Sequence, residues 1–191
     1  MESKVFVIGA STGGPDEIKT ILKNIPSDFS GTLIIVQHLL DDFSENFAKW
    51  LDKYSNIPVE EALDGEKVMQ GKAYVAPTGY HLAITNKDDS IIFKLETGET
   101  ISGFIPSIDV LFTSAAKAVK QNLTAIILSG MGYDSIKGAK LVKKFGGAVI
   151  VQAPPTCILD TMPKNIIKNK LFDEICVPEL MGSKIYQINN S

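Results

Sequence analysis

The chain has 191 residues, of which 45% are hydrophobic and 21% are charged, and its formal net charge is −3 at pH 7. This length suits a single domain, and the composition excludes a disordered or collagen-like chain. The small negative charge excludes a basic surface for nucleic acid, and every apolar run is far shorter than the roughly 20 residues of a membrane helix.

The start of the chain and its cysteines indicate where the protein works. Residues 1–4 lead directly into an apolar run, so we expect no signal peptide. The two cysteines, Cys157 and Cys176, make neither a disulfide framework nor a zinc site. We therefore expect one cytoplasmic domain spanning residues 1–191, with no membrane insertion.

A glycine-rich corner joins the first strand to the first helix. Val5–Ile8 form an uninterrupted apolar run, which is typical of a strand buried on both faces. The pattern becomes helical from Pro15, since proline is favoured in the first turn of a helix. Residues 9–13 read G-x-S-x-G, the spelling of a nucleophile elbow, in the strand–turn–helix context that this motif requires. Ser11 is therefore a candidate nucleophile.

The corner has other interpretations. It is also compatible with a glycine-rich turn that holds an incidental serine, or with a loop that binds a phosphate at the start of the helix. The dinucleotide fingerprint G-x-G-x-x-G and the P-loop G-x-x-x-x-G-K-S/T are both absent. A serine hydrolase and a phosphate-binding α/β protein both stay open at this point.

The middle of the chain changes from long elements to short ones. Thr32–His38 is a second buried strand that ends in two polar residues, and the apolar spacing over Asp42–Tyr54 is helical. Residues 57–105 hold short strand-like pieces separated by turn residues, with Asn86–Ser90 as a hairpin loop. We interpret residues 57–105 as an antiparallel excursion from an otherwise parallel sheet. Its pieces are Pro58–Ala62, Gly71–Ala76, Tyr80–Thr85 and Ile91–Leu95.

Strands and helices alternate again after residue 106. A helix begins at Ile108 with Ser107 as its cap, and a third buried strand follows at Thr124–Leu128. Ile136–Phe145 is a helix before a fourth strand at Ala148–Val151. Closing helices are expected at Pro163–Lys170 and Pro178–Ile188. These units predict the α/β class, with a doubly wound, mostly parallel sheet that binds ligands outside the carboxyl ends of its strands.

Three chemically complementary residues follow three of these strands. Ser11, His38 and Asp134 each stand at a carboxyl end, and these ends share one edge of a doubly wound sheet. A serine, a histidine and an aspartate are what acyl transfer needs, because the imidazole takes the hydroxyl proton while the carboxylate orients the imidazole. We predict that the three form a catalytic triad.

Each member of this triad has an alternative. His38 is also compatible with a histidine bonded to a backbone carbonyl, and Asp134 with a cap for the helix that follows it. Asp109 and Asp160 are rival carboxylates, but neither directly follows a buried strand. His81 lies in the antiparallel excursion, where a structural or rim role is expected.

Two further residues are candidates for the pocket. Met131 lies between two glycines, which would let its backbone N–H face a developing oxyanion; the alternative is a flexible turn with a core methionine. Thr12 adjoins Ser11 and either lines the pocket or caps the first helix. The order Ser…His…Asp differs from the Ser…Asp…His of α/β-hydrolases, so ordinary lipases and esterases fit poorly.

Five motifs stand in order along the chain. They are IGASTGGP at 8–15, VQH at 36–38, PSIDVLF at 106–112, LSGMGYD at 128–134 and TCILDTMP at 156–163. Together they resemble the catalytic, C-terminal domain of CheB-type protein-glutamate methylesterases, which act in bacterial chemotaxis. The match runs from about Val5 to Val177, and the combination is specific although each motif is weak.

The resemblance implies a fold, a reaction and partners. The fold is doubly wound α/β, and the reaction removes methyl esters from glutamates in the helical cytoplasmic region of methyl-accepting chemotaxis receptors. Ser11 would be the nucleophile, His38 the general base and acid, Asp134 the orienting carboxylate, and Met131 part of the oxyanion site. The acyl-enzyme is hydrolysed by water, receptor glutamines can also be deamidated, and neither a metal nor another cofactor is needed.

The chain departs from the family pattern at several places. A regulatory receiver domain usually precedes the catalytic domain and is lacking here, which implies either an excised fragment or an esterase controlled by a separate partner. Ser135 stands where glycine is usual, Phe104-Ile105 where a basic residue or histidine is common, and Ala153 where aspartate is common. A non-catalytic module that docks on receptors or a kinase complex therefore stays open as well.

Overall fold

The computed structural model describes residues 4–40, 42–88 and 90–191. Residues 1–3, on which the expectation of no signal peptide rests, and residue 89 of the expected hairpin loop lie outside the described residues. Within these ranges, no helix combines the length and the apolar character needed to cross a bilayer.

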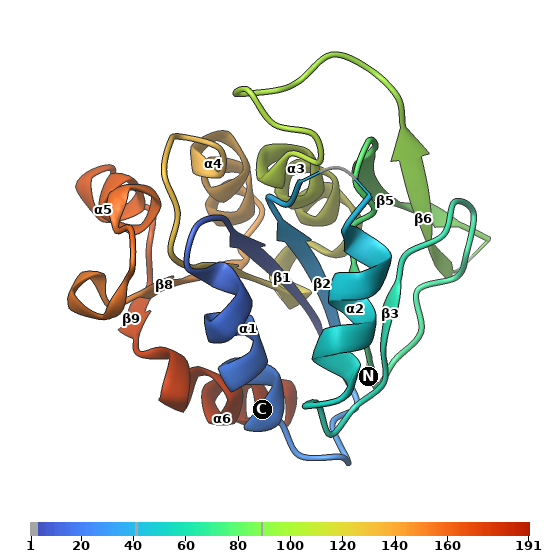
Figure 1. Cartoon of the computed structure of the whole chain (residues 1–191), viewed down its shortest axis with the longest axis horizontal. Helices are drawn as coiled ribbons and strands as arrows, with labels where there is room; N and C mark the ends of the chain where they lie inside the picture. Colours follow the sequence, from blue (N-terminus) through green and yellow to red (C-terminus); the bar gives the residue numbers. More distant parts are fainter. Residues whose placement is uncertain (1–3, 41, 89) are drawn as a thin grey trace.

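Seven parallel strands form the main sheet, in the order β3-β4-β2-β1-β7-β8-β9 (Figure 1). The strands are β1 (Val5–Ala10), β2 (Thr32–Gln37), β3 (Val59–Glu61), β4 (Lys72–Val75), β7 (Leu123–Ile127), β8 (Ala148–Gln152) and β9 (Glu174–Cys176). β1 lies at the centre, and all six of its residues are buried, as its uninterrupted apolar run predicts.

Helices cover both faces of this sheet, which confirms the doubly wound α/β prediction. One hydrophobic core lies between the sheet and α1, α2 and α6, and the other between the sheet and α3, α4 and α5. The helices are α1 (Gly14–Lys23), α2 (Ser44–Asp52), α3 (Ile108–Val119), α4 (Ile136–Lys144), α5 (Thr161–Lys168) and α6 (Pro178–Asn189).

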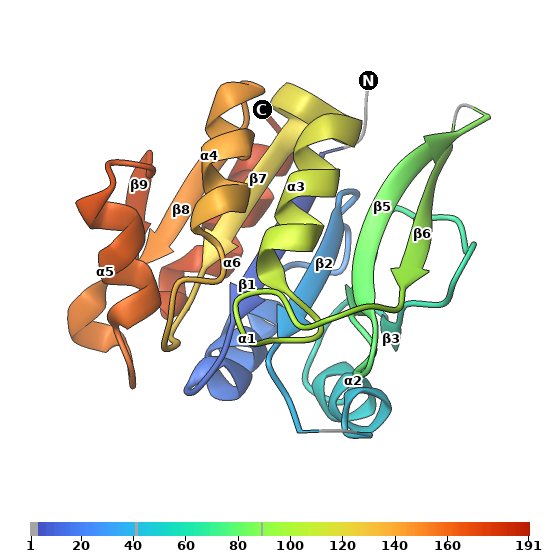
Figure 2. The same ribbon diagram turned by 90° about the horizontal axis from the view of Figure 1, so that it is seen from above.

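The antiparallel insertion is confirmed, but it is smaller than predicted. Among the strands of the described residues, only β5 (His81–Lys87) and β6 (Ser90–Glu96) pair antiparallel, as a two-stranded sheet beside α3 (Figure 2). The prediction that Pro58–Ala62 and Gly71–Ala76 belong to the excursion is wrong, because β3 and β4 pair in parallel within the main sheet. No helical pattern separates these two short strands, so the usual sign of a parallel crossover is missing from the sequence.

Close contact between β1 and α3 places the start of α3 at the carboxyl end of the central strand. A Cβ added at Gly9 of β1 would lie 2.5 Å from Cγ2 of Ile108, the first residue of α3. Glycine therefore lets the helix pack directly on the strand backbone.

We expect Gly9→Ala to destabilise the protein by about 2 kcal/mol, since a methyl group in this contact must push α3 away from β1. Urea unfolding measures the change. Gly98→Ala is the matched control, because among the described residues, its own chain neighbours aside, no atom lies within 4 Å of the position of its Cβ. Equal stability of the two variants would contradict direct packing of α3 on β1.

Candidate active site

Backbone hydrogen bonds fix Ser11 at the end of β1. Its N–H donates to the carbonyl oxygen of Ser129 at 2.9 Å, so the chain after β1 stays attached to the chain after β7. Its own carbonyl oxygen accepts from the N–H of Gly14 at 2.9 Å and from Nε2 of Gln37 at 2.8 Å. The Ser11 residue is 8% exposed and lies at the corner where the G-x-S-x-G motif predicts a nucleophile.

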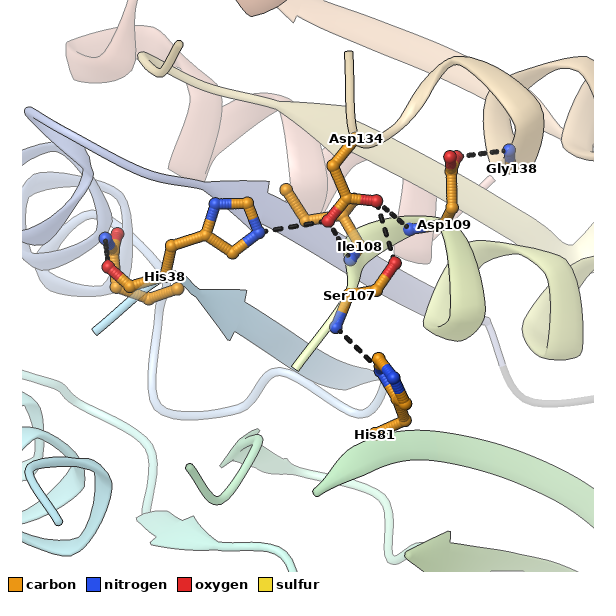
Figure 3. A network of polar contacts seen from close by, with 8 residues as sticks. His38, His81, Ser107, Ile108, Asp109, Asp134 and Gly138 are labelled. Atoms are coloured by element: carbon orange, nitrogen blue, oxygen red, sulfur yellow. Dashed lines mark hydrogen bonds and ion pairs between the residues drawn. The ribbon is translucent and has the colours of Figure 1, made fainter. Parts of the chain in front are cut away.

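His38 lies beside Ser11 and bonds to Asp134. The His38 N–H donates to the carbonyl oxygen of Ala10 at 3.0 Å, which continues the pairing of β1 with β2 up to Ser11. Nε2 of His38 lies 3.0 Å from Oδ2 of Asp134, and the two side chains are 6% and 0% exposed (Figure 3). The alternative of a bond to a backbone carbonyl is therefore wrong for Nε2. Nδ1 is buried without a hydrogen-bond partner among the described residues.

The Asp134 carboxylate is held at the start of α3. Oδ2 accepts from the N–H of Ile108 at 2.7 Å, while Oδ1 accepts from the N–H of Asp109 at 2.9 Å and from Oγ of Ser107 at 2.8 Å. A helix N-terminus favours a carboxylate through its free N–H groups and its dipole. Surrounded by donors, Asp134 can only accept from Nε2 of His38, which leaves Nδ1 as the basic nitrogen.

The helix that Asp134 caps is not the predicted one. The sequence position of Asp134 suggests the helix that follows it, α4, but the carboxylate bonds to the start of α3, 25 to 27 residues earlier in the chain. Ser107 does occupy the N-cap position of α3, yet its hydroxyl donates to Asp134 rather than capping the helix. Sequence reasoning missed Ser107 as a partner of Asp134.

The rival carboxylates have other partners. Oδ1 of Asp109 accepts the N–H of Gly138 in the first turn of α4 at 2.7 Å, so Asp109 caps α4 while Asp134 caps α3. Burial, and to a lesser extent the nearby charge of Asp134, raises the pKa of Asp109 from its ordinary 3.8 to about 6. Asp160 forms an ion pair with Lys164 on α5 at 2.7 Å.

His81 has a structural position, as expected. Its Nδ1 accepts the N–H of Ser107 at 3.1 Å (Figure 3). Its Nε2 lies 3.0 Å from the carbonyl oxygen of Glu99. Both ring nitrogens are therefore used in holding the segment that leads into α3. Within residues 4–40, 42–88 and 90–191, no three His, Cys, Asp or Glu side chains gather as metal ligands.

Thr12 and Met131, the two candidates for the pocket, are both exposed. Thr12 is exposed, and the N-cap of α1 is Gly13 with no side-chain bond, so the capping alternative for Thr12 is wrong. The Met131 side chain is not in the core, since the residue is 61% exposed. Its neighbour Gly130 touches the nucleophile candidate, because a Cβ there would lie 2.9 Å from Cβ of Ser11. The backbone of the 130–132 loop thus runs past Ser11.

A family model described as CheB methylesterase matches residues 6–185. The chain belongs to the CheB methylesterase family. A Thermotoga maritima protein named protein-glutamate methylesterase/protein-glutamine glutaminase is 35% identical over 98% of this chain and 55% of its own length, and a Halalkalibacterium halodurans protein of the same name is 38% identical over 96% and 53%. The chain spans about half the length of the curated relatives it matches.

A solved structure agrees with the CheB methylesterase assignment. The crystal structure of the Thermotoga maritima CheB methylesterase catalytic domain aligns with a TM-score of 0.96 and 35% identity, covering 98% of this chain and all of that one. This chain therefore corresponds, over nearly its whole length, to a domain that is described as catalytic in the Thermotoga maritima protein.

Phe104 is a site residue that sequence reasoning noted only as a departure from the CheB pattern. Its ring stacks on the His38 imidazole, with centroids 3.7 Å apart and planes 5° apart. A tight turn presents it, since Ile101 and Phe104 exchange backbone hydrogen bonds at 3.1 and 3.0 Å. The stacked ring restricts the imidazole to one plane, the plane in which Nε2 reaches Asp134.

Ser135 sits where the CheB resemblance leads us to expect glycine. Its φ is +143°, which side chains rarely adopt, and its buried Oγ has no hydrogen-bond partner among the described residues. We expect Ser135→Gly to raise the free energy of unfolding by about 1 kcal/mol, because strain and an unpaired hydroxyl are both removed. Denaturant unfolding measures this. Ser135→Ala, which removes only the hydroxyl, should gain less; the opposite ranking would contradict strain at this φ.

Burial of Asp109 predicts a pH dependence of stability. Its pKa is higher in the folded state, which therefore binds the proton more tightly than the unfolded state does. The contribution of Asp109 to stability is then greatest below its ordinary pKa of 3.8 and falls as the pH rises through about 6.

We expect wild type to lose about 1–2 kcal/mol relative to Asp109→Asn between roughly pH 4 and pH 7. Asparagine keeps an oxygen for the Gly138 N–H, so the comparison isolates the charge. Unfolding curves of both proteins at several pH values give the difference. A difference that does not vary with pH would mean that Asp109 titrates normally.

Proposed function

We propose that this chain is the catalytic part of a protein-glutamate methylesterase, a serine hydrolase that removes methyl esters from glutamate side chains of chemotaxis receptors. The observation that carries the proposal is the bond of Asp134 to His38, a residue whose backbone pairs with Ala10 next to Ser11. Nδ1 of His38 has no hydrogen-bond partner among the described residues and can therefore accept a proton. Family membership supports the choice of ester.

The reaction proceeds in two halves. Ser11 Oγ attacks the γ-carbonyl carbon of the methylated glutamate and gives its proton to Nδ1 of His38, while Asp134 stabilises the imidazolium through Nε2. The backbone N–H of Met131 donates to the oxyanion. The C–O bond to the methoxy group then breaks, and the imidazolium protonates that group as methanol leaves.

The second half restores the glutamate. A water molecule gives a proton to Nδ1 of His38 and attacks the acyl-enzyme carbonyl, and the imidazolium returns that proton to Ser11 Oγ as the ester bond breaks. A glutamine amide passes through the same tetrahedral intermediate and releases ammonia. We include this deamidation in the proposal because the relatives are named as glutaminases too.

The surroundings of Ser11 favour a protein substrate. Large apolar side chains are exposed in the segments that follow the carboxyl ends of the strands, a pattern typical of docking surfaces. They are Leu40 (83%), Met131 (61%), Tyr133 (69%) and Ile158 (71%). The partner in this proposal is the helical cytoplasmic region of methyl-accepting receptors, which places the protein in the cytoplasm, under the control of a receiver domain or a separate regulatory partner.

A phosphate site in the corner is disfavoured by charge. The side chain of Glu17, in the first turn of α1, is buried against the chain that follows β7. A carboxylate so close to the start of the helix opposes an anion there.

We expect Ser11→Ala to lower the rate of methanol release from methylated receptor by at least about 10³-fold, because no other group takes the place of the hydroxyl. Ser183→Ala, an exposed serine on α6, is the control and should match wild type. A fluorophosphonate probe should label wild type but not Ser11→Ala. Equal methanol release by Ser11→Ala and wild type would overturn the proposed nucleophile. If wild type binds receptor but the fluorophosphonate probe does not label it, a docking module would be favoured.

A further inference from the structure

We propose that Glu17 is a positioning residue that holds Ser11 and the 129–132 loop in place for hydrolysis; this rests on the proposed function. Glu17 lies in the first turn of α1, and the residue is only 8% exposed. None of the reaction steps above uses it. A buried carboxylate is costly unless its oxygens are well bonded, so its partners indicate what it does.

The partners of Glu17 are the residues that follow or end two strands of the sheet. Ser129, just after β7, donates its N–H to Oε2 at 3.1 Å and its hydroxyl to Oε1. Gln152, the last residue of β8, donates from Nε2 to Oε1 at 2.8 Å. The hydrogen bonds between neighbouring strands end at this edge of the sheet. The Glu17 carboxylate accepts hydrogen bonds there instead and so connects α1 to the ends of β7 and β8.

Ser129 transmits this position to the nucleophile. Its carbonyl oxygen accepts the N–H of Ser11 at 2.9 Å, so a shift of Ser129 moves the Ser11 backbone directly. The next residue, Gly130, packs against Ser11 and precedes the proposed oxyanion donor Met131. The Ser129 N–H also donates to Oε1 of Gln152 at 2.8 Å, so Glu17 and its partner Gln152 together fix the nucleophile relative to its oxyanion donor.

Ser129, Gly130 and Gln152 also bond to the 156–159 segment. The hydroxyl of Ser129 accepts the N–H of Ile158 at 3.1 Å, and the N–H of Gly130 donates to the carbonyl oxygen of Leu159 at 2.8 Å. Nε2 of Gln152 also lies 3.2 Å from the carbonyl oxygen of Thr156. Loss of Glu17 would thus loosen the 156–159 segment together with Ser11.

Asp173 provides a matched control, since it has similar chemistry at the opposite edge of the sheet. Its Oδ2 accepts the N–H of Val149, near the start of β8, at 2.8 Å, and its Oδ1 pairs with Lys143. Asp173→Ala therefore removes a carboxylate from a strand N–H without touching the site.

The experiment compares wild type, Glu17→Ala, Glu17→Gln and Asp173→Ala in methanol release, fluorophosphonate labelling, thermal unfolding and hydrogen exchange of the Ser11 amide. We expect Glu17→Ala to lower kcat about 100-fold with KM changed less than about 3-fold, because misplacement of a reacting group affects the chemical step. Labelling of Ser11 should slow in parallel, and its amide should exchange at least about 10-fold faster.

Glu17→Gln tests geometry apart from folding. Glutamine keeps the Oε1 acceptor but loses the Oε2 acceptor, so we expect a loss in kcat of about 3- to 10-fold and a melting temperature near that of wild type. If Glu17→Ala does not fold, the kcat and Ser11 exchange of Glu17→Gln test whether Glu17 is a positioning residue. Asp173→Ala should lose stability but keep kcat within about 2-fold.

Two outcomes overturn the inference. In the first, Glu17→Ala has a kcat within about 2-fold of that of Asp173→Ala, and its Ser11 amide exchanges at the wild-type rate. In the second, Glu17→Gln matches wild type in both kcat and the exchange rate of the Ser11 amide. Absence of methanol release by wild type would instead overturn the proposed function. The Ser11 exchange rate would then still report whether Glu17 holds the corner.

Discussion

The contact between the Asp134 carboxylate and the N-terminus of α3 is the interaction on which the site depends. The carboxylate is fully buried. In addition to the bond with His38, it accepts hydrogen bonds from two backbone N–H groups and from the Ser107 hydroxyl. Backbone donors at a helix start cannot rotate away, so the carboxylate is fixed by the fold rather than by other flexible side chains. The orientation of His38 follows from it.

Close packing of α3 keeps that contact in register with Ser11. Gly9 lets α3 touch β1, and Gly138 lets α4 approach α3, since a Cβ there would lie 2.4 Å from Cβ of Phe112. At this junction Asp134 caps α3, to which Asp109 belongs, and Asp109 in turn caps α4, which begins shortly after Asp134. The nucleophile candidate sits at the end of the strand that α3 packs on, so the three members of the proposed triad are held by the same packed elements.

Two buried carboxylates are thus bonded to residues next to Ser11 in the fold. Asp134 bonds to the imidazole of His38, and Glu17 accepts the N–H of Ser129, whose carbonyl oxygen accepts the N–H of Ser11. Phe104 adds a third constraint by stacking on the imidazole. In the proposed hydrolase, preorganisation of this kind is what reduces the reorganisation needed at the transition state.

The sequence by itself determined the α/β class, most elements and the strand ends at which Ser11, His38 and Asp134 stand, because apolar runs and helical periodicity are local properties of the chain. The tertiary structure alone decided that β3 and β4 join the parallel sheet, and that Asp134 caps α3. It also decided that Phe104 stacks on His38 and that Glu17 reaches Ser129, 112 residues away. Such partners are chosen by how whole layers pack, and a short stretch of sequence carries no record of which distant donor will face a buried carboxylate.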